Sequence, residues 1–105
     1  MAREYQLIVC IVNQGFSDEV IEASTRVGAK GGTIVSAHGS SNRQAEKLFD
    51  IAISPEKEIV LIVAKNEIVD DILKAVYEDV GLTTDGQGIA FTLPIDEAVM
   101  PQKQR

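Results

Sequence analysis

The chain has 105 residues, of which 45% are hydrophobic, 25% charged and 5% aromatic, and its formal net charge is −6. That length suits one domain of average globular composition, and the acidic balance excludes nucleic-acid binding through a basic face. The single cysteine, Cys10, excludes an internal disulfide and lies in an apolar run that predicts a buried, inert thiol. Without a signal segment or an apolar run of about 18 residues, we expect a cytoplasmic protein with no direct membrane insertion.

Four apolar segments predict β-strands. Residues 5–12 and 58–64 are rich in Ile and Val and are too short for free-standing helices, so they indicate buried strands. Residues 33–38 form a shorter apolar segment. In residues 89–94 large apolar side chains alternate, which indicates a half-buried strand. Because Pro94 has no N–H to donate, this strand is expected to lie at a sheet edge or to finish there.

Two segments have the period of an amphipathic helix. In the second, Asn66 is the expected N-cap and Gly81 the expected end, with one apolar stripe between them, made of Val69, Ile72, Leu73, Val76 and Val80. In the first, Ser17 is the expected N-cap and Gly28 ends the helix, with a stripe of Val20, Ile21, Ser24 and Val27.

The two halves of the chain align as strand–helix–strand units. Residues 18–23 match residues 70–75, and both helices end in Val-Gly. This pattern predicts an α+β, ferredoxin-like βαββαβ sandwich, a four-stranded antiparallel sheet with two helices on one face. We expect a single domain over residues 1–105 with a short tail at 97–105. Because the other sheet face is bare and aliphatic, we expect an oligomer.

Residues 40–57 connect the halves and are longer than a hairpin requires. Ser41 and Gln44 fit a capping box that opens a short turn. The segment is either an embellishment packed on its own domain or a loop that changes shape or docks a partner. In the second case Phe49 is the expected anchor, and Asn42, Arg43 and Lys47 offer polar groups to an anion.

Two glycine-containing turns precede equivalent strands. Residues 28–33 lead into the second strand and residues 85–88 into the fourth. They are either ordinary tight turns or anion nests built from successive N–H groups. Lys30 and Arg43 are the cations that a phosphate group would require.

Together these motifs give a resemblance to the P-II signal-transduction family, which includes nitrogen regulators. The matching features are Gly28-x-x-Gly31-x-Thr33, Gly39 with the long loop, residues 56–63, and residues 86–91 before 93–96. The resemblance implies a homotrimer with adenine nucleotides in its inter-subunit clefts. It also implies that the long loop, the family's T-loop, regulates a partner such as a membrane transporter or a metabolic enzyme.

The resemblance also implies site residues. The nucleotide-binding residues would be Gly31, Thr33, His38, Gly39, Ser40, Ser41, Asn42, Arg43, Gly86, Gln87 and Gly88, the last three forming the B-loop. Lys47 and Phe49 would contact the partner. The effector would be ADP, ATP, AMP or cyclic AMP, with no obligatory cofactor, no catalytic residues and no metal site, since His38 is the only histidine.

The sequence departs from the family pattern where phosphates would bind. Gln87 replaces the usual Asp of the B-loop, Ile89 occupies the position of the usual Lys, and Lys103 and Arg105 are the only substitutes for the C-terminal arginines. Two hypotheses therefore stay open: a nucleotide-binding regulator, or a trimeric partner-docking module with a cleft that binds no nucleotide.

Overall fold

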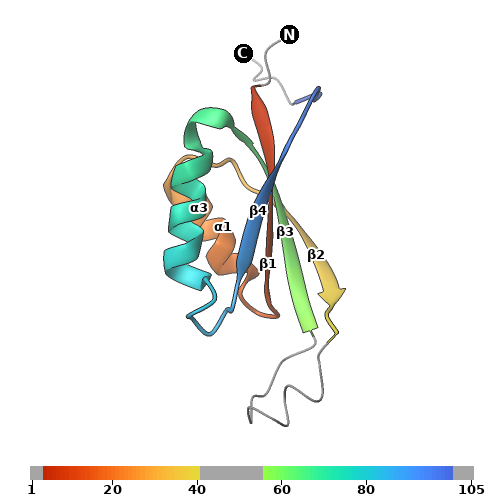
Figure 1. Cartoon of the computed structure of the whole chain (residues 1–105), viewed down its shortest axis with the longest axis vertical. Helices are drawn as coiled ribbons and strands as arrows, with labels where there is room; N and C mark the ends of the chain where they lie inside the picture. The colour runs from red at the N-terminus through yellow and green to blue at the C-terminus, as the bar shows by residue number, and fades with distance from the viewer. Residues whose placement is uncertain (1–3, 41–55, 101–105) are drawn as a thin grey trace.

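The computed structural model describes residues 4–40 and 56–100. Its elements follow the order strand, helix, strand, strand, helix, strand (Figure 1). They are β1 (Tyr5–Asn13), α1 (Ser17–Arg26), β2 (Thr33–His38), β3 (Glu56–Lys65), α3 (Asn66–Val80) and β4 (Ile89–Pro94). The strands form one antiparallel sheet in the order β2-β3-β1-β4. This confirms the ferredoxin-like prediction, including the placement of the Pro94 strand at an edge.

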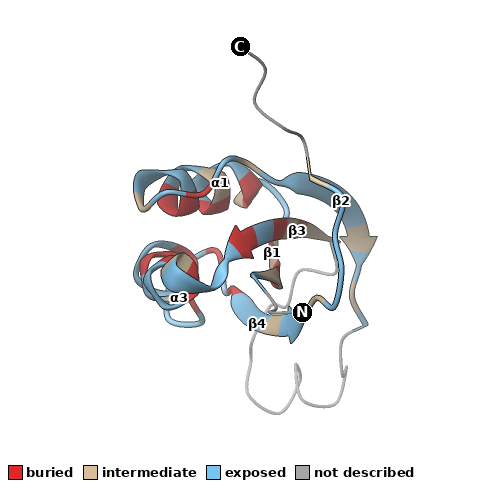
Figure 2. Ribbon diagram, turned by 90° about the horizontal axis from the view of Figure 1, so that it is seen from above, coloured by how far each residue is buried: buried red, intermediate tan, exposed pale blue. Residues whose placement is uncertain are grey.

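Both helices cover the same face of the sheet, and the buried residues lie between the two layers (Figure 2). Alternation along the strands directs every second side chain to this face. The sheet contributes Ile8, Cys10, Val12, Val60, Ile62 and Ala64, and the helices contribute Val20, Ala23, Val69, Ile72, Ala75, Val76 and Val80. The core is therefore aliphatic, as the composition predicts, and Cys10 is one of its members.

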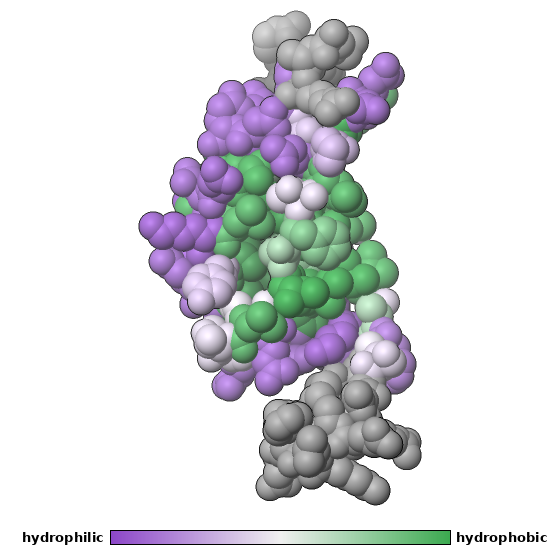
Figure 3. Space-filling view, viewed as in Figure 1, coloured by the Kyte–Doolittle hydropathy of each residue, from purple (hydrophilic) through white to green (hydrophobic). Residues whose placement is uncertain are grey.

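No described element covers the opposite face of the sheet. The strand register places Thr33, Leu61, Val9 and Phe91 in one row across this face. Large apolar side chains at the two edges are exposed, among them Val35, Ile89, Phe91 and Leu93. Figure 3 shows the resulting hydrophobic band along β4 between polar surfaces. The described part of the chain thus has the bare apolar face that the sequence predicts.

The helix starts differ from the prediction. α1 begins at Ser17 with Phe16 as its N-cap, and α3 begins at Asn66 with Lys65 as its N-cap. Ser17 and Asn66 are therefore the first helical residues and not caps. β3 continues directly into α3, which leaves no loop residue to serve as a cap. The Asn66 side chain instead accepts a hydrogen bond from Gln6 Nε2 at 3.1 Å.

The two glycines predicted to end the helices do so for different reasons. Gly28 has a φ of +115°, the left-handed conformation that a glycine adopts without strain. Gly81 is the C-cap of α3 but has an extended backbone, with φ −66° and ψ −174°. A Cβ atom at Gly81 would clash with the carbonyl oxygen of Tyr77. Close approach of the backbone, and not a positive φ, accounts for this glycine.

Candidate ligand and partner site

The segment 40–57 leaves the sheet after β2 and returns to it at β3. His38 and Glu56 pair across the two strands at this point, with His38 Nδ1 3.2 Å from Glu56 Oε2. β3 begins earlier than the sequence predicts, so that Glu56 and Lys57 belong to the strand and not to the loop. The end of β2 and the start of β3 are thus paired with each other where the segment joins the sheet.

Several predicted site residues lie outside the described part of the chain. These are Ser41, Asn42, Arg43, Lys47 and Phe49, and the predicted Ser41–Gln44 capping box lies there too. Gly39 and Ser40 are described and follow β2 directly. Of the segment 40–57, the described part of the chain therefore includes Ser40 and residues 56–57.

The turn at residues 85–88 lies between α3 and β4. Its left-handed residue is Gln87, with a φ of +48°, and not one of the flanking glycines. The Gln87 amide donates to Thr84 O at 3.0 Å, and the Gly88 amide donates to Val80 O at 2.6 Å. These bonds close the turn on itself, so an anion nest at this position would lack two of its expected donors.

Close packing accounts for the glycine at position 88. A Cβ atom at Gly88 would lie 2.5 Å from Val80 O and 2.9 Å from Val12 Cγ1. No L side chain fits there unless α3 or β1 moves, because real Cβ atoms do not approach other atoms so closely. The glycine therefore has a structural role that is independent of any ligand.

The other glycine turn leads into β2. Gly31 has a φ of +132°, and a Cβ atom at Gly32 would lie 3.0 Å from Leu61 O. Thr33 pairs with Leu61 in the middle of β3, whereas His38 pairs with Glu56 at its start. Thr33 and Lys30 are exposed.

The described residues of the predicted nucleotide site do not lie together within one chain. They fall into three groups: Gly31 and Thr33 where β2 begins, His38–Ser40 where it ends, and Gly86–Gly88 before β4. β2 and β4 are opposite edges of the sheet, and three strand spacings separate them by about 14 Å. A ligand that touches Thr33 and the 85–88 turn of the same chain would have to span this distance across the sheet.

The structure also shows a polar junction that the sequence analysis missed. Lys57 Nζ donates to Asn13 Oδ1 at 2.7 Å. Glu58 Oε1 accepts from the backbone amides of Gly15 at 3.1 Å and Ser17 at 3.2 Å. The pKa of Glu58 is lowered, chiefly by a hydrogen bond from the Ser17 side chain. Partial desolvation acts in the opposite direction, and the two backbone amides lower the pKa further. These residues lie about 40 positions apart in the chain, and no sequence motif with a fixed spacing could have predicted that they meet.

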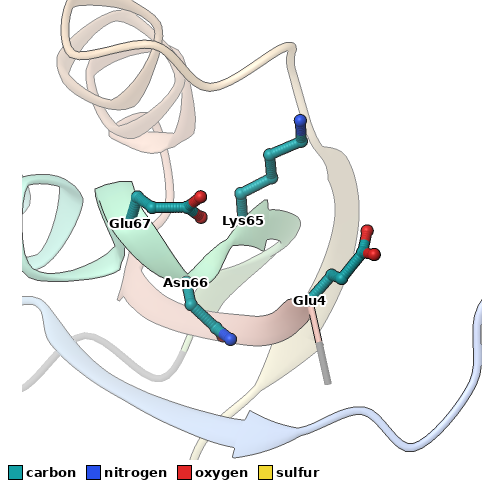
Figure 4. Close-up of a pocket in the computed structure, with 4 residues that line it drawn as sticks. All are labelled: Glu4, Lys65, Asn66 and Glu67. Carbon is teal, nitrogen blue, oxygen red and sulfur yellow. The ribbon is translucent and has the colours of Figure 1, made fainter. Parts of the chain in front are cut away.

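A shallow depression lies at the end of β3 opposite the 85–88 turn. Glu4, Lys65, Asn66 and Glu67 line it, and their polar ends do not converge on one point (Figure 4). None of them is a predicted site residue. Within residues 4–40 and 56–100, no cluster of His, Cys, Asp or Glu could hold a metal ion. No helix in the same residues is long and apolar enough to cross a membrane.

Comparison with solved structures finds the same fold. The Arabidopsis thaliana PII protein bound to citrate has 20% identity and a TM-score of 0.70, and the match covers 94% of this chain and 82% of that one. B. subtilis GlnK in complex with ATP has 17% identity and a TM-score of 0.68, covering 90% and 84% of the two chains. A functionally unknown protein from Pediococcus pentosaceus has 14% identity and a TM-score of 0.68, covering 94% and 99%.

The comparison with curated protein sequences gives no match. The family model "Nitrogen regulatory protein P-II" matches residues 5–105. That match spans both halves, the segment 40–57 and the 85–88 turn. The chain therefore belongs to the nitrogen regulatory protein P-II family, as its motifs predict.

Proposed function

We propose that this protein is a homotrimeric P-II regulator that binds an adenine nucleotide between subunits and controls a partner protein through residues 40–57. Its role is regulatory and not catalytic, and it acts in the cytoplasm as a single domain. The observation that carries the proposal is the bare sheet face with its row of apolar side chains from Leu61 to Phe91.

The bare face supports self-association. Phe91 is 44% exposed and Leu93 48% exposed, and complete burial of such a side chain contributes about 1.5–3 kcal/mol. Contiguous apolar surface of this kind marks an interaction site. A closed, symmetric ring of copies buries one such face from each chain without leaving a free end for further growth.

The separation of the predicted site residues supports a cleft between subunits. Gly31 and Thr33 belong to the β2 edge, and Gly86–Gly88 precede the β4 edge on the other side of the sheet. A neighbouring copy that brings its β4 edge to the β2 edge supplies both groups to one ligand. The effector would be ATP, ADP, AMP or cyclic AMP, and the B. subtilis GlnK complex with ATP provides a precedent on the same fold.

Calorimetric titration of the purified chain with ATP, ADP, AMP and cyclic AMP tests the nucleotide part. We expect at least one to bind with one site per chain, and Thr33→Ala to weaken that binding. Thr25→Ala, an exposed change on α1, is the matched control and leaves the affinity unchanged. Absence of heat and of thermal stabilisation with all four nucleotides refutes this part of the proposal.

One observation favours a second candidate, a trimeric docking module without nucleotide binding. Ile89 occupies the position of the usual lysine of the family and is 46% exposed, and the amides of Gln87 and Gly88 are already bonded within the turn. Such a module would retain its partner equally well with and without nucleotide. A pull-down with this protein as bait, repeated with and without about 1 mM ATP, separates the two candidates because only the regulator should change the amount of partner it retains.

A further inference from the structure

Asn13, the last residue of β1, contacts two segments that are far apart in the chain. Its side-chain Oδ1 accepts from Lys57 Nζ at 2.7 Å, and its Nδ2 donates to Asp85 O at 3.0 Å. Its backbone amide donates to Gly86 O at 2.9 Å. One residue thus joins the start of β3 to the turn that precedes β4.

The chemistry of the amide group makes the two side-chain contacts interdependent. An asparagine side chain has one acceptor oxygen and one donor nitrogen in a single plane. Reversal of the Asn13 side chain would place its oxygen against Asp85 O and its NH2 group against the Lys57 ammonium, and both contacts would be repulsive. The position of Lys57 therefore favours the orientation in which Asn13 holds Asp85.

The other residues at the start of β3 contact different parts of the molecule. The Gln14 amide donates to Glu56 O at 3.1 Å, and Glu58 contacts the start of α1 through Gly15 and Ser17. The contact from Lys57 leads through Asn13 to the 85–88 turn. The 85–88 turn itself is held by hydrogen bonds from the Gln87 and Gly88 amides to the carbonyl oxygens of Thr84 and Val80.

We propose that Asn13 is a positioning residue that couples the start of β3 to the 85–88 turn, so that displacement of Lys57 loosens the hydrogen bonds of the turn. The coupling is a property of the ligand-free chain. Its use in regulation rests on the proposed function: a ligand held at the 85–88 turn would then alter the point at which residues 40–57 return to the sheet. The free energy of such coupling is reciprocal, so either end influences the other.

Amide hydrogen exchange measured by NMR on the nucleotide-free protein tests this proposal. Lys57→Met removes the donor to Asn13 but touches neither Gln87 nor Gly88. We expect both amides to exchange about threefold faster or more, as loss of one net hydrogen bond predicts, relative to the Ile72 amide in the core of α3. Lys65→Met, at the other end of the same strand, is the matched control and leaves the ratio unchanged.

A second variant separates coupling from general destabilisation. Asn13→Asp keeps an acceptor for Lys57 but loses the donor to Asp85, so it accelerates the turn amides by itself. Adding Lys57→Met to Asn13→Asp then has little further effect, because the path is already broken. Unchanged turn amides in Lys57→Met, equal acceleration at Ile72, or fully additive effects of the two changes would each overturn the proposal. Since no nucleotide is present, failure of nucleotide binding leaves this test unaffected.

Discussion

The carboxylate of Glu58 replaces the side-chain cap that the start of α1 lacks. It belongs to β3, yet one of its oxygens accepts from Gly15 N at 3.1 Å and Ser17 N at 3.2 Å. Glu58→Ala leaves both amides without this partner. Loss of an N-terminal cap costs about 0.5–2 kcal/mol. Because the Gly15 contact is exposed and the Ser17 contact only partly buried, we expect about 1 kcal/mol. Glu58→Gln keeps an acceptor without the charge and should lose about half as much.

The measurement is thermal unfolding at one fixed chain concentration, since the stability of an oligomer depends on concentration. A change of 1 kcal/mol corresponds to about 4–8 °C in a domain of this size. Glu22→Gln, an exposed change in the middle of α1, is the control and shifts the midpoint little. An unchanged midpoint for Glu58→Ala at pH 7 would refute the capping role.

The pH dependence of Glu58→Gln tests the same contact independently. Hydrogen bonding lowers the pKa of Glu58 in the folded protein, whereas an unfolded Glu has a pKa of about 4.3. The stabilisation is therefore complete above the unfolded pKa and disappears as the pH falls through the folded pKa. The difference in stability between wild type and Glu58→Gln should shrink over that acidic range, and a constant difference would contradict the reasoning.

Three further experiments test the packing and the charges. Gly88→Ala forces a Cβ against Val80 O, so we expect a loss of about 1–3 kcal/mol in urea denaturation. Burial raises the pKa of Cys10 to about 11, so the folded protein should resist alkylation at pH 8 and react only when urea unfolds it. The exposed ion pair between Arg26 and Asp79, at 3.2 Å, should contribute less than about 1 kcal/mol, so Arg26→Ala should barely change stability, and less still at high salt.

The fold follows from the sequence because its signals are local and repeated. The stripe from Val69 to Val80 depends on one element's own periodicity and is confirmed. Residues 89–94 form the predicted strand, but Ile89, Phe91 and Leu93 are exposed in the single chain, because they lie on the bare face of the sheet. The aliphatic core follows from the same patterns. Pro94 also predicted an edge strand for a purely local reason, its missing N–H.

The errors arise where distant segments meet. Ser17 and Asn66 fit the sequence rules for caps, but a carboxylate from β3 serves α1, and β3 runs directly into α3. The left-handed residue of the 85–88 turn is Gln87, although glycine, which stands on either side of it, adopts that conformation with less strain. The junction of Asn13 and Lys57 joins residues on different strands, and no spacing rule relates them.

Native mass spectrometry with ATP present tests the central claim most directly, because it reports the number of chains and of bound nucleotides together. The account predicts a particle of three chains of 11.4 kDa with up to one nucleotide per chain. Phe91→Asp, which places a charge on the bare face, should yield monomers without nucleotide, whereas Tyr77→Asp on α3 should not. A wild-type monomer, or a Phe91→Asp monomer that retains nucleotide, would contradict a ligand site built between subunits.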